Sequence, residues 1–328
     1  MKKHLSIFKC PGCAADLEIN GTSITCVSRK HVFMIKEGIP LLCKTPTDGQ
    51  GVTNKIKEFY EQHPLPNYDE IDNTDRLISK AKDSVFGHLL NEQIGYNTKL
   101  LEIGCGTGQL SNFLATKERW VFGADLSFGS LRLGNNFKNE NEIKRVGFYQ
   151  MDLFKPIFKD KSFDFVISNG VLHHTEDAYK GFVSILKLLK KDGYIIVGLY
   201  NKYGRLPTDI RRFLINTFGK KFKDLDPYMK TKNTGAAKKE IWFLDQYKNP
   251  HETKYTIEDV VAWFDKNNVE FVKCIPSANI FNNFSQDEKL FEKTEKINKF
   301  SALISQLLFA LRGSMEGGLF VMIGKKNE

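Results

Sequence analysis

The sequence predicts an α/β fold in which helices cover a doubly wound, mostly parallel sheet, with a small N-terminal domain and a helical insertion added. Three observations lead to this prediction. Short apolar runs alternate with segments of helical periodicity between residues 99 and 200, which is typical of a parallel sheet. A glycine-rich turn follows the first of these runs, at 104–108. Four of the six cysteines lie within the first 43 residues.

The composition is that of a globular protein. The chain has 328 residues, which is enough for one large domain and a small one. Hydrophobic residues make up 41% and charged residues 27%, which argues against disorder. No apolar run approaches the about 20 residues of a membrane-spanning helix, and residues 1–8 lack the apolar core of a secretory signal. We therefore expect a cytoplasmic protein without membrane insertion.

Residues 1–44 are predicted to form a zinc ribbon. Cys10 and Cys13 form a C-x-x-C pair, which is typical of a knuckle around a tetrahedral metal, and the clustering of cysteines favours a metal over disulfides. A domain of about 40 residues buries too little apolar surface to be stable unaided. Alternating runs around Asn20-Gly21 predict a hairpin. The predicted ligands are Cys10, Cys13, Cys26 and His31, with Cys43 as the alternative to His31.

Residues 45–98 are predicted to be a linker followed by N-terminal helices. The linker, 45–53, contains proline and glycine and little that is apolar. A short helix follows from Ile56, and Pro64 and Pro66 end it. An amphipathic helix over 75–95 then leads into the first strand of the sheet.

The first strand and its turn make a cradle of nucleotide size. Leu100, Leu101 and Ile103 indicate a buried strand, and the glycines that follow permit a sharp turn and the close approach of a ligand. The next helix points its N-terminus at the same gap. Gln109 breaks the G-x-G-x-x-G fingerprint of dinucleotide sites, and no lysine follows as a P-loop would require.

Two further strands are predicted to end in acids beside this turn. The strand over 120–125 ends in Asp125, where a carboxylate can accept hydrogen bonds from both ribose hydroxyls of a nucleoside. The strand over 146–152 ends in Asp152. The remaining predicted strands are one that begins at 163 and ends before the loop at 172, and those over 193–200, 269–275 and 317–324.

This order of motifs resembles the class I S-adenosylmethionine-dependent methyltransferases. The glycine turn is similar to their motif I, and the stretch 163–174 is similar to their motif IV, which ends beside the transferred methyl group. The resemblance implies a methyltransferase domain over 99–328 with seven strands, of which the last is antiparallel. It also implies that the cofactor-binding residues are Glu102, Gly104, Gly106, Gly108, Asp125, Leu126, Met151, Asp152 and Asn169.

The same resemblance implies that 56–68 is an N-terminal lid whose aromatic residues cover the cofactor; the alternative is a proline-terminated helix packed on the domain. It also implies a role for several of the cofactor-binding residues. The glycine turn would hold the methionine part of the cofactor, and Asp125 would hold the ribose. Asp152 would contact the adenine amino group, and Asn169 would line the methyl site. His173 and His174 follow directly, and a histidine here could remove a proton from an oxygen or nitrogen nucleophile. We place His174 ahead of His173; the alternative is that one of them only shapes the cofactor pocket.

The N-terminal stretch resembles two zinc-binding modules. Its Cys-Cys-Cys-His set and the His31-Val32-Phe33 element are similar to the zinc-binding region of a bacterial 23S rRNA guanine methyltransferase. Residues 35–42 are similar to the small zinc-ribbon activator subunit of eukaryotic tRNA methyltransferases. A closed Cys/His site has no open position for catalysis, so the zinc is expected to be structural.

Residues 201–255 are predicted to be an insertion after the fifth strand. They hold thirteen Lys or Arg and six Asp or Glu, a surplus of seven positive charges. Such a stretch attracts RNA or an acidic small substrate, or is simply a solvated surface. Its first residues, 201–205, are expected to contact the substrate. Beyond it, Thr256 begins a capping box, and a helix over 290–311 packs on the core or pairs two subunits of a homodimer.

We therefore expect an S-adenosylmethionine-dependent methyltransferase that acts on an oxygen or nitrogen nucleophile of a small-molecule acceptor. The alternative acceptor is RNA, either tRNA or rRNA, bound by the zinc ribbon and the basic insertion. A non-catalytic cofactor-binding or scaffold protein is the second alternative. It is disfavoured because no cofactor residue implied by the resemblance is missing.

Overall fold

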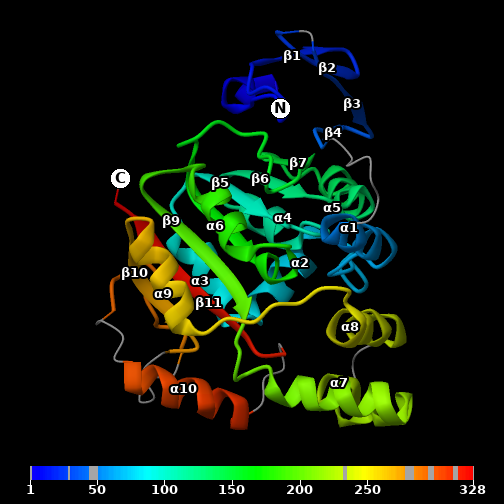
Figure 1. Cartoon of the computed structure of the whole chain (residues 1–328). Helices are drawn as coiled ribbons and strands as arrows, with labels where there is room; N and C mark the ends of the chain where they lie inside the picture. Colours follow the sequence, from blue (N-terminus) through cyan, green and yellow to red (C-terminus); the bar gives the residue numbers. More distant parts are fainter. Residues whose placement is uncertain are drawn as a thin grey trace.

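A mixed sheet of eleven strands forms the centre of the molecule (Figure 1). The computed structural model describes residues 2–28, 30–43, 51–231, 235–277, 284–294, 299–312 and 317–327. Most of the predicted linker over 45–53 lies outside the described residues.

Five parallel strands make the core of the sheet, as the alternation of strands and helices predicts. They are β5 (Lys99–Ile103), β6 (Trp120–Asp125), β7 (Val146–Gln150), β8 (Phe163–Asn169) and β9 (Leu189–Tyr200), side by side in the order β7-β6-β5-β8-β9. The strand order reverses between β5 and β8, and such a reversal leaves a crevice at the carboxyl ends of the strands.

Two antiparallel strands complete this side of the sheet. They are β10 (Val269–Ile275) and β11 (Leu319–Lys326), and β11 pairs with both β9 and β10. The predicted α/β fold with a mixed, mostly parallel core is therefore confirmed.

The N-terminal strands extend this sheet instead of forming a separate one. They are β1 (Leu17–Asn20), β2 (Ser23–Cys26), β3 (Val32–Lys36) and β4 (Ile39–Leu41), which pair in antiparallel order. The predicted hairpin is the pair of β1 and β2. Strand β4 then pairs in parallel with β7, where Leu41 lies opposite Gln150. The sheet has eleven strands instead of the predicted seven because the N-terminal strands join its edge.

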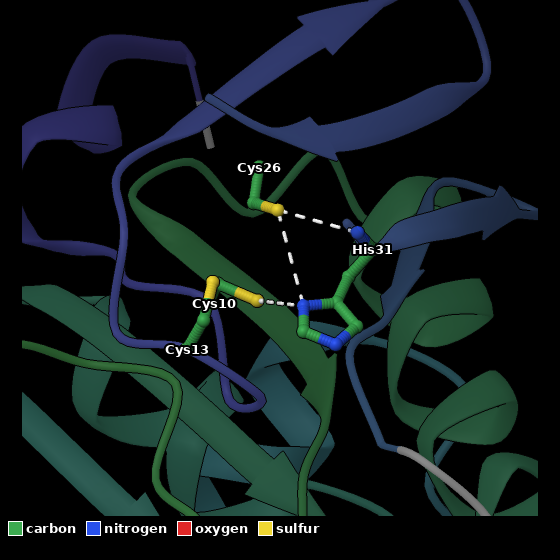
Figure 2. Close-up of side chains that lie close together, drawn as sticks. All are labelled: Cys10, Cys13, Cys26 and His31. Carbon is green, nitrogen blue, oxygen red and sulfur yellow. Dashed lines mark hydrogen bonds between the residues drawn. The ribbon is translucent and has the colours of Figure 1, made fainter. Parts of the chain in front are cut away.

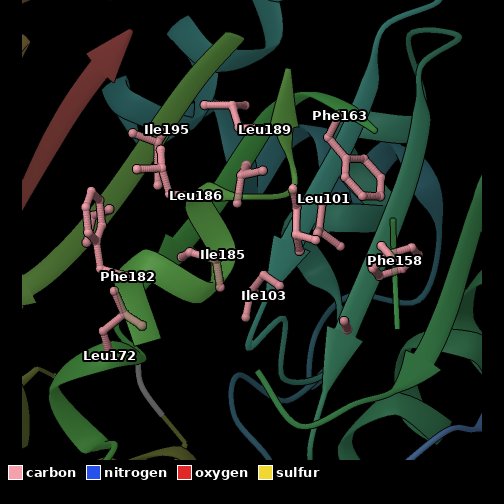
Figure 3. Packing of buried hydrophobic residues seen from close by; sticks show 14 of the residues in the cluster. Leu101, Ile103, Phe158, Phe163, Leu172, Phe182, Ile185, Leu186, Leu189 and Ile195 are labelled. Carbon is pink, nitrogen blue, oxygen red and sulfur yellow. The ribbon is translucent and has the colours of Figure 1, made fainter. Parts of the chain in front are cut away.

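Helices cover both faces of the sheet. On one face, α6 (Ala178–Leu186) and α9 (Ile257–Lys266) pack on a buried apolar cluster that includes Leu101 and Ile103 of β5 (Figure 3). A second buried cluster, which includes Leu100, lies on the other face. The helices packed on it are α2 (Thr74–Lys82), α3 (Val85–Gln93), α4 (Gln109–Ala115) and α5 (Phe128–Glu140). Strand β5 is thus covered on both sides, as its apolar residues Leu100, Leu101 and Ile103 predict.

Side-chain caps set several helix boundaries. Thr256 and Asp259 form the predicted capping box at the start of α9. Ser127 caps α5 by accepting the N–H of Ser130, also as predicted. The single helix predicted over 75–95 is two helices, because Ser84 accepts the N–H of Gly87 and begins α3.

Residues 201–255 form the expected helical insertion, at the end of the molecule opposite the N-terminal strands (Figure 1). Its helices are α7 (Leu206–Phe218) and α8 (Ala236–Lys248), with short 3-10 turns at Lys220–Leu225 and Tyr228–Lys230 between them. Two more helices flank this region: α1 (Val52–Gln62) and α10 (Lys299–Arg312). Of the helix predicted over 290–311, the structure describes α10, and Leu290 is buried in a turn of the described segment 284–294. Within the described residues, no helix combines the length and the apolarity needed to cross a bilayer.

Candidate active site

The glycine turn closes against the end of β6. Gly104 and Gly106 have φ angles of 69° and 53°, in the left-handed region that favours glycine. A Cβ atom at Gly106 would lie 2.2 Å from the carbonyl oxygen of Leu65, and one at Gly104 would lie 2.2 Å from the Val171 side chain. The N–H of Gly106 donates to Asp125 (2.8 Å to Oδ2). Only glycine therefore fits here, and the turn contacts the acid predicted to bind the ribose.

Two carboxylates, the partly buried Asp125 and the buried Glu102, stand beside the turn. Asp125 accepts a second main-chain hydrogen bond, from the N–H of Ser127 to Oδ1 (2.8 Å), and burial raises its pKa. Glu102 accepts the hydroxyl proton of Ser111 in α4, and burial raises the pKa of Glu102 to about 7. Glu102 therefore ties β5 to the helix that follows it.

A cavity of about 690 Å³ lies at the carboxyl ends of these strands, within the size range of ligand sites. Eight of the nine residues predicted to bind the cofactor line it: Glu102, Gly104, Gly106, Asp125, Leu126, Met151, Asp152 and Asn169. The ninth, Gly108, caps the start of α4, where a Cβ atom would lie 2.2 Å from the ring of Phe148. Gly108 thus serves helix packing and does not line the cavity.

The segment after α1 is fastened onto the glycine turn. The N–H of Thr107 donates to the carbonyl of Leu65 (3.3 Å), and its hydroxyl donates to the carbonyl of Pro66. The side chain of Gln109 donates to the carbonyl of Asn67 (2.5 Å). Leu65 and Pro66 also line the cavity. The predicted lid segment is therefore held in place by the turn that it covers.

His174 stands in the cavity wall, with one ring nitrogen bonded to the main chain. It lines the cavity, and its Nδ1 lies 2.7 Å from the carbonyl oxygen of His251, so we infer that Nδ1 carries the proton and donates it. Nε2 is then the acceptor nitrogen. Burial lowers the pKa of His174, against an opposing effect from Asp245, so the ring is neutral near pH 7. A neutral ring with a free lone pair is the form that accepts a proton.

His173 has no comparable access to the cavity. Its side chain is 0% exposed, and the ring packs on Tyr200 with centroids 4.0 Å apart. Neither ring nitrogen has a hydrogen-bond partner among the residues that the structure describes. Burial lowers its pKa well below the ordinary value. The structure thus separates the two candidate histidines: His174 faces the cavity, whereas His173 packs behind it.

Four side chains that sequence reasoning did not single out complete the cavity wall: Tyr60, Tyr200, Asp245 and Gln246. The Tyr60 hydroxyl donates to Asp245 (2.9 Å to Oδ1). Gln246 donates through Nε2 to both Asp245 and the Tyr200 hydroxyl, each at 2.9 Å. Burial raises the pKa of both tyrosines, so their hydroxyls keep their protons. The sequence carries little signal for Asp245 and Gln246, because residues 224–251 have no clear period and only the fold brings α8 to α1.

Arg205 holds the insertion against the sheet. Its buried guanidinium donates to both carboxylate oxygens of Glu252 (3.0 and 2.6 Å) and to the carbonyl of Gly317 (2.9 Å), and it lies 3.8 Å from the ring centroid of Tyr200. The expectation that residues 201–205 contact the substrate is therefore wrong for Arg205. It is also wrong for Asn201, which is buried and bonded to Gln306. Both residues fix the cavity wall from behind.

Comparison with known proteins identifies the domain that holds this cavity. The sequence profile of a family described as "Methyltransferase domain" matches residues 94–267, which is more than half of the chain. The chain belongs to this family. The matched methyltransferase domain begins just before β5 and ends just after α9.

Individual relatives of the methyltransferase domain match over shorter stretches. Phosphoethanolamine N-methyltransferase 2 from Caenorhabditis elegans is 34% identical over 107 residues, which are 32% of this chain and 24% of that protein. Demethylmenaquinone methyltransferase from Clavibacter sepedonicus is 29% identical over 136 residues, which are 40% of this chain and 55% of that protein. The matches therefore span about a quarter to about half of the length of these relatives.

A solved structure agrees in fold. PKMT2 from Rickettsia typhi, in complex with AdoHcy, superimposes with a TM-score of 0.50 at 18% identity, covering 71% of this chain and 49% of that one. At this identity the likeness concerns the fold of the methyltransferase domain alone.

Outside the methyltransferase domain, the structure brings the four predicted metal ligands together (Figure 2). Nδ1 of His31 lies 3.3 Å from the sulfur of Cys10 and 3.9 Å from that of Cys26, and the ligand atoms of all four residues lie within 4.8 Å of one another. Tetrahedral zinc, with bonds of about 2.0–2.3 Å, places its ligand atoms about 3.5–3.8 Å apart. The cluster therefore fits a zinc ion. Cys43 lies outside it, half-buried near Asp152, and burial raises the pKa of Cys43 to about 11.

Proposed function

We propose that this chain transfers a methyl group from S-adenosylmethionine to an oxygen or nitrogen nucleophile of a small-molecule acceptor. The observation that carries this proposal is a single cavity lined both by the glycine turn and by His174, Tyr60 and Asp245. Helices α1 and α8 both contribute to its walls, which favours an acceptor small enough to enter between them. Two relatives are named for phosphoethanolamine and demethylmenaquinone, and these names agree with a small acceptor.

The cofactor would lie along the ends of β5, β6 and β7. The glycine turn would hold its methionine part, Asp125 would accept hydrogen bonds from the ribose hydroxyls, and Asp152 would accept one from the adenine amino group. Leu126 and Met151 line the cavity beside these acids and would pack on the adenine. S-adenosylmethionine supplies the electrophilic methyl group when bound.

The acceptor would be activated by His174, and Asn169 would line the methyl site. Nε2 of His174 would take the proton that the nucleophile loses. Asp245, held by Tyr60 and Gln246, would hydrogen-bond a polar group of the acceptor. These groups would fix the acceptor in line with the methyl group, and such positioning is the main contribution that a protein makes to a displacement of this kind.

RNA is the second candidate acceptor, and exposed lysines in the insertion favour it. Two observations weigh against it. The N-terminal strands and the insertion lie at opposite ends of the molecule, so a single short RNA segment would not contact both (Figure 1). Four of the thirteen cations in the insertion, Arg205, Arg212, Lys238 and Lys254, are engaged in ion pairs with protein carboxylates.

We propose three parts for the chain: a zinc ribbon over 1–44, a linker and lid over 45–98, and the catalytic domain over 99–328 with its insertion at 201–255. Zinc bound by Cys10, Cys13, Cys26 and His31 would be structural, because four protein ligands leave no open position for a substrate.

The proposal is tested by incubating the protein with methyl-labelled S-adenosylmethionine and a fractionated cell extract. We expect label to enter small metabolites, and we expect the His174→Gln variant to transfer far less. Label in RNA, with binding that weakens steeply as salt is added, would establish the second candidate instead. A protein that binds S-adenosylhomocysteine in calorimetry but labels nothing would point to a non-catalytic cofactor-binding role.

A further inference from the structure

Helix α7 carries its apolar stripe on the outside. Successive residues of a helix are rotated by about 100°, so Leu206, Ile210 and Phe213 lie within about 60° of one another. All three are exposed, and Ile210 and Phe213 are 60% and 64% exposed. Thr208 and Ile215, on the opposite face, are buried. An amphipathic helix normally turns its apolar stripe toward the core, so this stripe has another use.

The exposed apolar surface extends beyond α7. Phe218 at the end of the helix and Leu225 in the next turn are exposed as well. Helix α10 reaches the start of α7, since a Cβ atom on Gly204 would lie 2.6 Å from the ring of Phe309. Helix α10 itself exposes Leu303 and Leu307. We call the exposed side chains of α7 and the next turn, namely Leu206, Ile210, Phe213, Phe218 and Leu225, the α7 patch. An exposed apolar surface built from neighbouring elements in this way marks an interaction site.

Positive charge accompanies the α7 patch. Exposed lysines lie before α7 and in the turns after it, and none of them forms an ion pair within the described residues. Over 202–231, Asp224 is the one exposed acid among the described residues. Lysine stems can lie along apolar surface while their ammonium groups reach outward. The lysines concerned are Lys202, Lys221, Lys223 and Lys230.

We propose that the α7 patch docks this chain onto the anionic surface of a lipid bilayer. A bilayer interface accepts apolar side chains among the acyl chains and lysines among anionic headgroups at the same time. A second copy of this chain fits less well, because a symmetric pairing would bring like charges together. RNA fits less well too, because the aliphatic side chains Leu206, Ile210 and Leu225 neither stack on bases as aromatic rings do nor bind phosphate. The inference is independent of the proposed acceptor.

The test is sedimentation of the full chain with phosphatidylcholine vesicles, prepared with and without phosphatidylglycerol. We expect binding to the anionic vesicles only, and less binding as salt is added. The double variant Ile210→Ser/Phe213→Ser should weaken the partition by about tenfold or more. The variant Lys221→Glu/Lys223→Glu should weaken it as well, while leaving the apolar stripe intact.

A matched control keeps the test specific. Met34→Ser/Tyr96→Ser removes two other exposed apolar side chains outside the α7 patch and should leave vesicle binding unchanged. All three variants should bind S-adenosylhomocysteine in calorimetry as the unmodified chain does, which establishes that they are folded. The proposal is overturned if the unmodified chain does not bind anionic vesicles. It is also overturned if the control variant loses as much binding as Ile210→Ser/Phe213→Ser. It is also overturned if light scattering finds a dimer in vesicle-free solution that Ile210→Ser/Phe213→Ser converts to a monomer.

Discussion

Asp125 sits where the glycine turn meets β6, and its carboxylate already accepts two main-chain hydrogen bonds. We predict that Asp125→Ala weakens the binding of S-adenosylhomocysteine by about tenfold or more, because the ribose hydroxyls lose a charged acceptor. Calorimetry measures the change. Because burial raises the pKa of Asp125, affinity should fall on acidification at a higher pH than for an exposed aspartate.

A second substitution at this position separates charge from shape. Asp125→Asn keeps the size of the side chain, and it should weaken binding less than Asp125→Ala while removing the pH dependence assigned to this residue. Equal binding by Asp125→Ala and the unmodified chain would contradict the assignment of this residue to the ribose.

Substitutions of His174 and of His173 are expected to differ in their effect on activity. His174→Gln should lower kcat by about 100-fold or more, with little change in cofactor affinity, because the base is lost. The rate should fall only on the acid side of pH 6.5, since burial lowers the pKa of His174 from that value. His173→Leu removes two buried nitrogens that have no partner, so stability should change by no more than about 1 kcal/mol. Retained activity in His174→Gln would refute the base assignment.

At this scale, sequence patterns found the residues at strand ends and missed those on the helices around the cavity. Gly104, Asp125 and Asp152 follow apolar runs directly, so their places in the cavity could be predicted from local sequence. Tyr60 and Asp245 are 185 residues apart, and only tertiary packing brings them within hydrogen-bond distance. No periodicity in either segment encodes that contact.

Among the elements, the insertion is held against the sheet by one buried ion pair. Arg205 and Glu252 are both buried and joined at 2.6 Å. We predict that Glu252→Gln lowers the free energy of unfolding by about 3–5 kcal/mol, because it leaves a buried guanidinium without its counter-charge. Urea denaturation measures this loss. The matched variant Glu240→Gln changes an exposed glutamate of α8 and should shift stability by less than about 0.5 kcal/mol. Similar losses in both variants would contradict a special role for the pair.

The same pair predicts how stability depends on pH. Burial alone would raise the pKa of Glu252, but Arg205 and Arg212 hold it at about 2, below the ordinary 4.5. The stabilising contribution is therefore complete above pH 4.5 and is lost as the pH falls toward 2. A shift of this size corresponds to about 3 kcal/mol. Glu252→Gln should flatten the pH dependence of the melting temperature in this range.

Helix boundaries could be predicted where a capping residue marked them. The prediction was wrong where a capping residue was overlooked. The capping box at Thr256 and the cap at Ser127 are short-range signals, and both helices begin as predicted. Ser84 carries a signal of the same kind, but the apolar period runs across it and suggests one continuous helix. Leu290 is apolar and buried as well, but it lies in a turn before α10, and periodicity alone does not distinguish such a residue from a helical one.

At the scale of the whole molecule, the N-terminal strands that carry the Cys/His cluster belong to the same sheet as the strands of the methyltransferase domain. We predict about one zinc ion per chain by elemental analysis, and a lower melting temperature after chelation, since zinc binding stabilises small Cys/His domains. Cys13→Ser should lose the metal. Cys43→Ser should retain it, because Cys43 lies outside the cluster. Retention by Cys13→Ser together with loss in Cys43→Ser would refute this ligand set.

The sheet as a whole was predictable only from β5 onward. There, β5, β6 and β8 are each followed by a helix, and this repeating strand–helix unit can be recognised in the sequence. The pairing of β4 with β7 joins residues 109 positions apart through one short contact, at Leu41 and Gln150. Neither strand has a sequence pattern that predicts its pairing with the other, so we expected a separate N-terminal domain.

This junction has a consequence for any shortened form of the protein. A chain that starts at residue 51 would lose the pairing of Leu41 with Gln150 and would uncover the outer edge of β7 at that point, where another such chain can pair. It would also uncover the rings of Tyr149 and Phe158, which Phe8 now covers at centroid distances of 5.0 and 4.9 Å. We therefore expect sedimentation velocity to detect self-association of the shortened protein. The first forty residues would then protect the chain from aggregation, whether or not they bind a partner.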